Sequence, residues 1–377
     1  MVKSLTISVQ EDLITPPGSS TEARSEESLY TEFAPDIRWI QERVRADHET
    51  LPAALRDVAR YYLTQRIRVL HDRDPTCSAH HLSPRPIPYL AFWFARAFGL
   101  KDAQVRRLLG LSLVYVCLSA SPRDDLLDGS GFAPHQQTYL ARWFWEKYFL
   151  VLKKLFPTDS PIWYVLSRST ADWGSGERWA LCQNRHETAN PLSANFLRNA
   201  STYLVALIFP TLAGVAFLSN QPNKVSTIRR FVCYYCMGWR ILDDFRDWQD
   251  DRLEANIDGS SILSFLRVQA GIPSSMPLTR ELAVSLLSDQ AVVGQIYSAM
   301  AGFFLAARRE AESIPAAYVT RLIDQQLLGH KVELAQMAAE KAKFRNCIAQ
   351  LLEAENGIKK RVANKNSRGK RAWKDSR

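Results

Sequence analysis

Cysteine is scarce in this 377-residue chain: six are present, too few for the disulfide framework of a small secreted protein. The first thirty residues contain no apolar stretch of the kind that a signal peptide needs, and their acidic residues argue against a transit peptide. A mean hydropathy of −0.20 excludes a protein built mostly of membrane spans. We therefore expect a soluble, cytoplasmic protein with no transmembrane span.

The motifs of several common enzyme classes are also missing. The sequence has no Walker A, G-x-S-x-G or G-x-G-x-x-G pattern. Its cysteines and histidines are not spaced as zinc ligands, and the pair Cys233 and Cys236 lies within an apolar segment, which favours buried packing over redox chemistry. These absences argue against a P-loop NTPase, an α/β-hydrolase, a dinucleotide-dependent enzyme and a zinc protein.

Positive charge is concentrated at one end of the chain. The net charge is +9, but residues 357–377 hold nine Lys and Arg against one Asp, which leaves only +1 for the other residues. The body therefore lacks the basic surface of a nucleic-acid-binding protein, and we expect no specific nucleic-acid partner. The basic tail is either a solvated, disordered end or a segment weakly attracted to anionic lipid or RNA; Trp373 favours a membrane surface.

Strand patterns are scarce, because apolar residues recur at intervals of three and four rather than two. This periodicity predicts an all-α fold with about ten to twelve helices in a single large bundle. We expect one domain over residues 33–356, flanked by a flexible segment at 1–32 and the tail at 357–377. The apolar run 203–218 predicts a central helix, kinked or broken at Pro210.

Two aspartate clusters of the form D-D-x-x-D each follow an apolar helical run. The first comprises Asp124, Asp125 and Asp128, and the second Asp243, Asp244 and Asp247, with Asp250 and Asp251 beyond it. At about 100° per residue, the three aspartates of each motif share one helix face, and Asp251 stays on that face better than Asp250. Such self-repelling carboxylates favour a Mg²⁺ site, although solvated helix ends remain the alternative.

Taken together, the two motifs and the helical pattern resemble the class I isoprenoid synthase family, which includes trans-prenyl diphosphate synthases and class I terpene cyclases. The resemblance implies that the motifs face each other across the mouth of a helical bundle and bind three Mg²⁺ ions with a prenyl diphosphate substrate. The implied metal ligands are Asp124, Asp125, Asp128, Asp243, Asp244, Asp247 and Asp251. The implied catalytic residues are Asp124, Asp125, Asp243 and Asp244.

Departures from the family's pattern bear on the reaction type. Chain-elongating synthases carry G-G-K-R-x-R-P, of which only Arg85 and Pro86 are matched, and an arginine pair after the first motif, which is missing. Arg240 stands where a Gln usually precedes the second motif. We therefore expect a terpene synthase that cyclises or quenches one ionised substrate, although the N-D-x-x-S-x-x-x-E motif of many cyclases is missing too. A chain-elongating prenyltransferase and a non-enzymatic helical scaffold remain alternatives.

Several other residues are candidates for the substrate site. Arg198, Arg185 and Arg240 could bind the diphosphate, or form ordinary salt bridges. The small residues Ser119, Ala120 and Ser121 before the first motif favour a deep pocket for a long prenyl chain. Relatives often pair, so a homodimer is a further expectation. Aromatic residues on candidate helices could line the pocket or belong to the core: Phe92, Trp93, Phe94, Trp143, Phe144, Trp145, Tyr203, Tyr234, Tyr235 and Trp239.

Overall fold

The computed structural model describes residues 32–66, 87–127, 129, 131–182, 190–248, 260–273, 276, 278–314 and 317–329. The chain divides into two units, Met1–Asp324 and Gln325–Arg377, and the helices described below belong to the first. The predicted flexible segment at 1–32, apart from its last residue, and the basic tail at 357–377 lie outside the described residues. Both therefore stay predictions.

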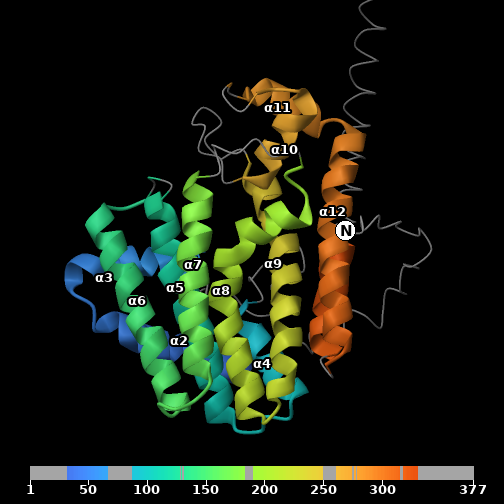
Figure 1. The fold of residues 1–377 in the computed structure, drawn as a ribbon. Coiled ribbons are helices and arrows are strands. Elements are labelled where there is room, and N and C mark those ends of the chain that lie inside the picture. Colours follow the sequence, from blue (N-terminus) through green and yellow to red (C-terminus); the bar gives the residue numbers. More distant parts are fainter. Residues whose placement is uncertain are drawn as a thin grey trace, which may run out of the picture. The chain divides into compact units, whose positions relative to one another are not determined.

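All regular elements in the described ranges are helical (Figure 1). This confirms the predicted all-α class, which follows from the three-and-four spacing of apolar residues. The α-helices of the first unit are α2 (Ala34–Glu49), α3 (Ala53–Tyr61), α4 (Ile87–Ala97), α5 (Ala103–Leu127), α6 (Pro134–Leu155), α7 (Ile162–Cys182), α8 (Ala194–Leu218), α9 (Val225–Asp247), α10 (Ser261–Ala270), α11 (Arg280–Leu287) and α12 (Gln290–Glu312).

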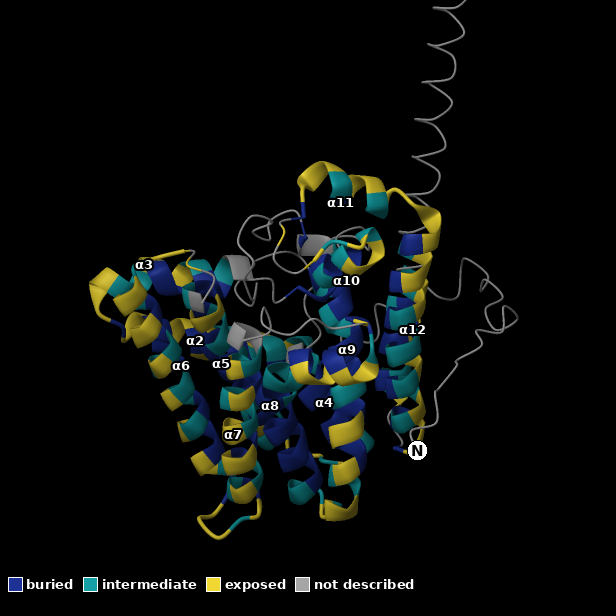
Figure 2. Cartoon of the chain, turned by 45° about the horizontal axis from the view of Figure 1, so that its top comes forward, coloured by how far each residue is buried: buried dark blue, intermediate teal, exposed yellow. Residues whose placement is uncertain are grey.

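Helix α8 lies at the centre of the bundle. It packs against α7 on one side and α9 on the other, and it also contacts α4 and α5. Every residue from Ala206 to Ala216 is buried, whereas α6 and α7 present exposed faces (Figure 2). A helix surrounded by other helices must be apolar on all sides, which explains the uncharged run that the sequence places here.

Within the part of the chain that the structure describes, three helices are long and apolar enough to cross a membrane by length and composition alone: α5, α8 and α12. In the folded chain, 67% of the most apolar stretch of α8 and 56% of that of α5 are buried inside the protein, against 39% for α12. The apolar run in α8 is therefore not unusual in this chain, because α5 and α12 are similar in length and apolar composition. Packing inside the bundle accounts for the apolar character of α5 and α8.

We predicted a kink or a break at Pro210, and the break does not occur, because α8 is one continuous helix from Ala194 to Leu218. Proline removes the hydrogen bond that its missing N–H would donate to the carbonyl four residues earlier. The residues around Pro210 are buried on all sides, and Thr211 shares a 3.0 Å hydrogen bond with Ser112 of α5. Tertiary packing thus holds the helix together where local chemistry disfavours it.

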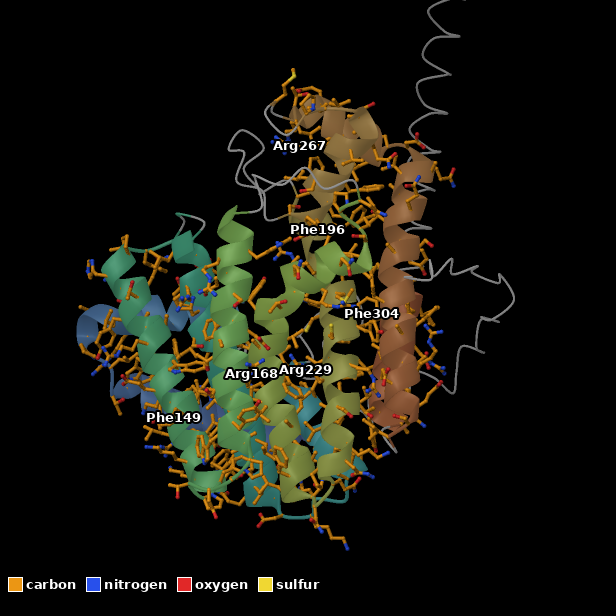
Figure 3. The ribbon with its side chains drawn as sticks, in the orientation of Figure 1. Phe149, Arg168, Phe196, Arg229, Arg267 and Phe304 are labelled. Carbon is orange, nitrogen blue, oxygen red and sulfur yellow. The ribbon has the colours of Figure 1, made fainter. Side chains whose placement is uncertain are left out.

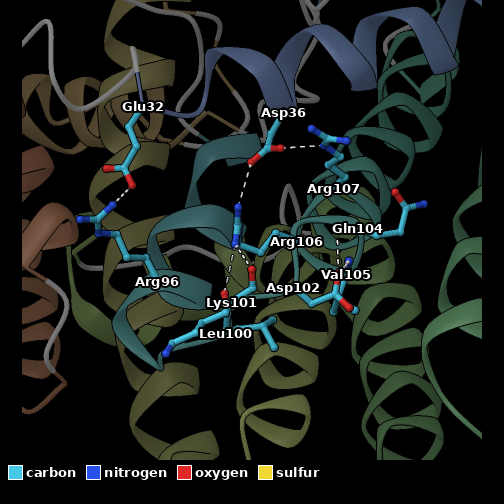
Figure 4. A network of polar contacts seen from close by, with 10 residues as sticks. All are labelled: Glu32, Asp36, Arg96, Leu100, Lys101, Asp102, Gln104, Val105, Arg106 and Arg107. Carbon is cyan, nitrogen blue, oxygen red and sulfur yellow. Dashed lines mark hydrogen bonds and ion pairs between the residues drawn. The ribbon is translucent and has the colours of Figure 1, made fainter.

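An ion-pair network attaches α2 to the start of α5 (Figure 4). Arg107 donates from Nε to Asp36 Oδ1 at 2.7 Å, and Arg106 Nη2 lies 3.6 Å from the other oxygen of Asp36. Asp102 accepts hydrogen bonds from the backbone N–H groups of Gln104 and Val105 and so caps α5. These contacts orient the helix whose far end carries the first aspartate motif.

Helices α9 and α12 approach closely at Gly238. A Cβ added there would lie 3.2 Å from the ring of Phe304, which would have to move slightly to make room for it. Phe304 also meets Tyr235 edge to face, with ring centroids 5.8 Å apart, and Figure 3 shows it lying toward α9. This contact positions α9, whose end carries the second aspartate motif.

Candidate functional site

The first aspartate motif lies at the end of α5, and its two leading carboxylates differ in environment. Asp124 is exposed, whereas Asp125 is buried, with 1% of its surface exposed. A Cβ added to Gly131, which has a φ of +83°, would lie 3.2 Å from Asp125 Oδ2. Asp125 therefore turns toward the segment that leads into α6. Asp128, the third predicted ligand, lies outside the described residues.

The second motif occupies the end of α9 and shows the same contrast. Asp243 is half-buried and Asp244 is buried, with 6% exposed. Asp247 is the last residue of α9, but its side chain lies outside the described part of the chain, as does all of Asp251. The structure thus locates four of the seven predicted carboxylate side chains.

Both oxygens of Asp244 contact other protein groups. Oδ2 accepts hydrogen bonds from the backbone N–H and the hydroxyl of Ser261, each at 2.6 Å, and Oδ1 lies 3.0 Å from Nε of Arg240. Burial raises the pKa of Asp244 to about 6, although Arg240 and Ser261 act in the opposite direction. Asp244 thus connects the end of α9 to the start of α10.

Electrostatic interactions with Arg240 and Tyr203 link the two motifs. Arg240 donates a 2.9 Å hydrogen bond to the Tyr203 hydroxyl on α8. Burial lowers the pKa of Arg240, but Asp244, Tyr203, Asp243 and Asp124 raise it more, so that it lies above its ordinary value. Burial, with the same three aspartates, also raises the pKa of Tyr203. Asp124 of α5 and Asp243 of α9 therefore act on the same two side chains.

The donor set suits a hard divalent ion shared with phosphate rather than an ion held by protein alone. Among the described residues, no three His, Cys, Asp or Glu side chains form a group that could hold a metal ion. Mg²⁺ commonly uses one or two carboxylates and completes its shell with water and substrate phosphates. Asp124 and Asp243 fit that role, and the role predicted for Asp244 as a metal ligand stays a prediction.

The predicted diphosphate-binding arginines have different surroundings. Arg240 lies between the motifs. Arg198 is exposed on α8 and interacts with Cys233; burial raises the pKa of that thiol, and Arg198 partly offsets the rise. Arg185 lies outside the described residues. Arg123, beside the first motif, pairs with Glu177 and lies over the ring of Trp173 of α7 at 5.1 Å.

The candidate aromatic residues separate into two groups. Phe92, Trp93 and Phe94 are fully buried core residues on α4. On α9, Phe231, Tyr235 and Trp239 stack one turn apart, with centroid separations of 5.7 and 6.4 Å, and Asp243 follows one turn later. Phe231 packs against Phe94 and Tyr235 against Phe304, so these two rings belong to the core.

Sequence reasoning missed the partners that hold the site together. Ser261 lies 17 residues after Asp244, and no periodic pattern connects them. Ser260 was the available signal, because a serine before an apolar run marks a helix start, and its hydroxyl does cap α10 by accepting from the N–H of Leu263. The role of Tyr203 as partner of Arg240 had no signal at all.

No known family profile matches this sequence, and no curated protein sequence matches it. Solved structures do match. A geranylgeranyl pyrophosphate synthetase from the archaeon Geoglobus acetivorans superposes with a TM-score of 0.60 at 16% identity, covering 79% of this chain and 98% of that one. A decaprenyl diphosphate synthase from Rhodobacter capsulatus gives 0.60 at 14% identity, over 80% and 98%. The chain has the class I isoprenoid synthase fold.

A heptaprenyl diphosphate synthase from Staphylococcus aureus is similar too, with a TM-score of 0.58 at 13% identity, over 77% of this chain and 96% of that one. The isoprenoid synthase fold extends over nearly the whole length of each of these proteins, so the likeness is not confined to a few helices. It confirms the fold that the two aspartate motifs imply. At identities of 16% and below, it establishes the fold alone.

Proposed function

We propose that this protein is a Mg²⁺-dependent prenyltransferase that ionises an allylic prenyl diphosphate and joins the prenyl group to isopentenyl diphosphate. The observation that carries the proposal is that Asp124 and Asp243, from distant parts of the chain, both act electrostatically on Arg240 in an isoprenoid synthase fold. The sequence alone favours cyclisation. We favour chain elongation over cyclisation, because the similar structures named above are all prenyl diphosphate synthases.

The proposed reaction breaks the allylic C–O bond, and the departing diphosphate keeps the electron pair. The double bond of isopentenyl diphosphate supplies the electrons of the new C–C bond, and one proton is lost. When bound, Mg²⁺ stabilises the negative charge that develops on the departing diphosphate. Asp124 and Asp243 would hold the metal, with three ions implied by the family. Arg240, oriented by Tyr203 and Asp244, would contact the diphosphate.

Cyclisation remains a second candidate because a specific observation favours it. Elongation needs basic residues for a second diphosphate, and the first Lys or Arg residues after Asp128 are Arg142 and Lys147. Arg142 donates to Glu146 at 2.9 Å, and Lys147 donates to Asp47 at 2.8 Å. Both are therefore committed elsewhere, whereas a cyclase needs only one diphosphate site.

One assay separates the candidates. The purified protein is incubated with Mg²⁺ and allylic diphosphates from C10 to C25, with and without isopentenyl diphosphate. Longer diphosphates formed only with isopentenyl diphosphate support the transferase. Hydrocarbons or alcohols formed without it support the cyclase. Absence of both, together with no Mg²⁺-dependent binding of diphosphate, would leave a non-enzymatic scaffold.

Asp124→Asn and Asp243→Asn test whether the activity belongs to this site. Each should lower turnover by at least about 100-fold, because each removes a carboxylate proposed to hold the metal. Asp172→Asn is the matched control, since that aspartate pairs with Arg229 at 3.2 Å away from both motifs. Its turnover should stay close to that of the unmodified protein. Equal losses in all three variants would contradict the site.

A further inference from the structure

Arg240 is the side chain at which the acidic groups of the site meet. Its guanidinium lies 3.0 Å from Asp244 and 2.9 Å from the Tyr203 hydroxyl, and only 17% of the side chain is exposed. Asp243 and Asp124 also act on its charge. The position belongs to α9, one turn before Asp244, so a single helix supplies both the arginine and two of the carboxylates.

Asp244, Asp243 and Asp124 all act on Arg240, and only Asp244 is buried. Like charges repel one another, so without a cation these carboxylates raise the free energy of the folded protein, the buried one most. Arginine is protonated at every physiological pH, so Arg240 provides a positive charge that does not depend on conditions. Asp244 fixes that charge from one side, and its own second oxygen is held by Ser261. Loss of the guanidinium would therefore leave the buried Asp244 without its cationic partner.

We infer that Arg240 is a resident cation of the acidic site, which neutralises the carboxylates in the metal-free protein and opposes the entry of a divalent ion on its own. The diphosphate group, by contrast, is attracted by Arg240 and brings the charge that lets Mg²⁺ bind beside it. The inference shares one assumption with the proposed function, namely that divalent ions enter this site.

The test measures the binding of MgCl₂ alone, without prenyl substrate, to the unmodified protein and to Arg240→Gln. Isothermal titration calorimetry should show that the variant binds Mg²⁺ at least about tenfold more tightly, because a like charge has been removed next to the ion. Thermal unfolding should show a lower Tm for the variant without Mg²⁺ and recovery when MgCl₂ is added. The Tm of the unmodified protein should not respond to MgCl₂.

Two further variants serve as controls. Arg240→Lys keeps the charge and should behave like the unmodified protein toward Mg²⁺. Arg229→Gln removes an arginine of the same helix that pairs with Asp172 away from the motifs, and Mg²⁺ should not restore any Tm that this variant loses. MgCl₂ at matched ionic strength is compared with KCl throughout, so that general screening is subtracted.

Equal Mg²⁺ affinity in the unmodified protein and Arg240→Gln would overturn the inference. So would a rise of the Tm of the unmodified protein with MgCl₂ alone, a result that needs no variant and holds even if Arg240→Gln does not fold. These outcomes are independent of turnover. Absence of any prenyl-diphosphate reaction would remove the proposed function and leave the comparison of Mg²⁺ affinities intact.

Discussion

Asp47 shows how a single buried charge can join three helices. It lies on α2, where it accepts hydrogen bonds from Lys147 of α6 at 2.8 Å, from Arg43 at 3.1 Å and from the hydroxyl of Tyr115 on α5. Burial tends to raise the pKa of Asp47, but these partners outweigh it, and the pKa lies below its ordinary value of 3.8. The carboxylate is therefore stabilised in its charged form.

Asp47→Asn should lower the free energy of unfolding at pH 7 by about 2–4 kcal/mol, because it leaves buried donors without their charged acceptor. The depressed pKa means that this stabilisation is complete above pH 3.8 and is lost as the pH falls through the pKa of the folded protein. Urea unfolding at several pH values measures it. The gap between variant and unmodified protein should narrow in acid. Asp57→Asn, at an exposed pair with Arg60, should show no such gap.

Two fully buried tyrosines should respond in opposite ways to removal of the hydroxyl. Tyr115 donates to Asp47, whereas among the described residues the hydroxyl of Tyr148 has only Thr211 within reach, in a geometry short of an ordinary hydrogen bond. Tyr115→Phe should cost about 1–3 kcal/mol, and Tyr148→Phe should be neutral or stabilise by up to about 1 kcal/mol. Denaturant midpoints measure both changes. A loss in Tyr148→Phe as large as that in Tyr115→Phe would reveal a partner for Tyr148.

At the scale of the helix, the sequence predicted where the two motifs lie, but not which of their aspartates are buried. The apolar periodicity predicts the helices that α5 and α9 form, and the aspartates lie at their ends as expected. Helical spacing also predicts that consecutive aspartates share one face. The roughly 100° between them is, however, enough to turn Asp125 and Asp244 into the protein while Asp124 and Asp243 remain accessible. Asp125 and Asp244 are buried by tertiary contacts with other parts of the chain, and such contacts leave no periodic pattern in the sequence.

Ser261→Ala should loosen the attachment of α10 to α9. The variant removes one of the two hydrogen bonds that Ser261 donates to Asp244 and keeps the other, from the backbone N–H. We expect a loss of about 1–3 kcal/mol and faster amide exchange in both α10 and the end of α9. Ser260→Ala, which removes only the cap of α10, should speed exchange in α10 alone. Hydrogen–deuterium exchange distinguishes the two variants.

At the scale of the whole molecule, the fold follows from the apolar pattern of the helices, whereas the type of reaction depends on single side chains. Helices of the right length with apolar faces suffice for an isoprenoid synthase bundle, which explains how it persists at 16% identity. The difference between elongation and cyclisation depends instead on whether basic groups are available for a second diphosphate. Lys147 is present in the sequence but is taken up by Asp47, a residue 100 positions away. No reading of local sequence could show that commitment.

Charge is also distributed at this scale, and the distribution leads to a last prediction. Residues 357–377 carry +8 of the net +9, so a chain ending at residue 356 is almost neutral overall. Each Lys or Arg near an anionic membrane contributes about 1 kcal/mol at low salt, and screening reduces this as salt rises. The full chain should therefore sediment with phosphatidylserine vesicles at low salt and dissociate at high salt, whereas the shortened chain should not bind. Vesicles of phosphatidylcholine alone serve as the control.

Because Arg240 and the aspartates lie elsewhere, the shortened chain should behave like the unmodified protein toward MgCl₂ and toward prenyl diphosphates. Equal vesicle binding by both chains would instead place the membrane contact on the helical unit, where the half-exposed apolar stretch of α12 would be the first surface to test.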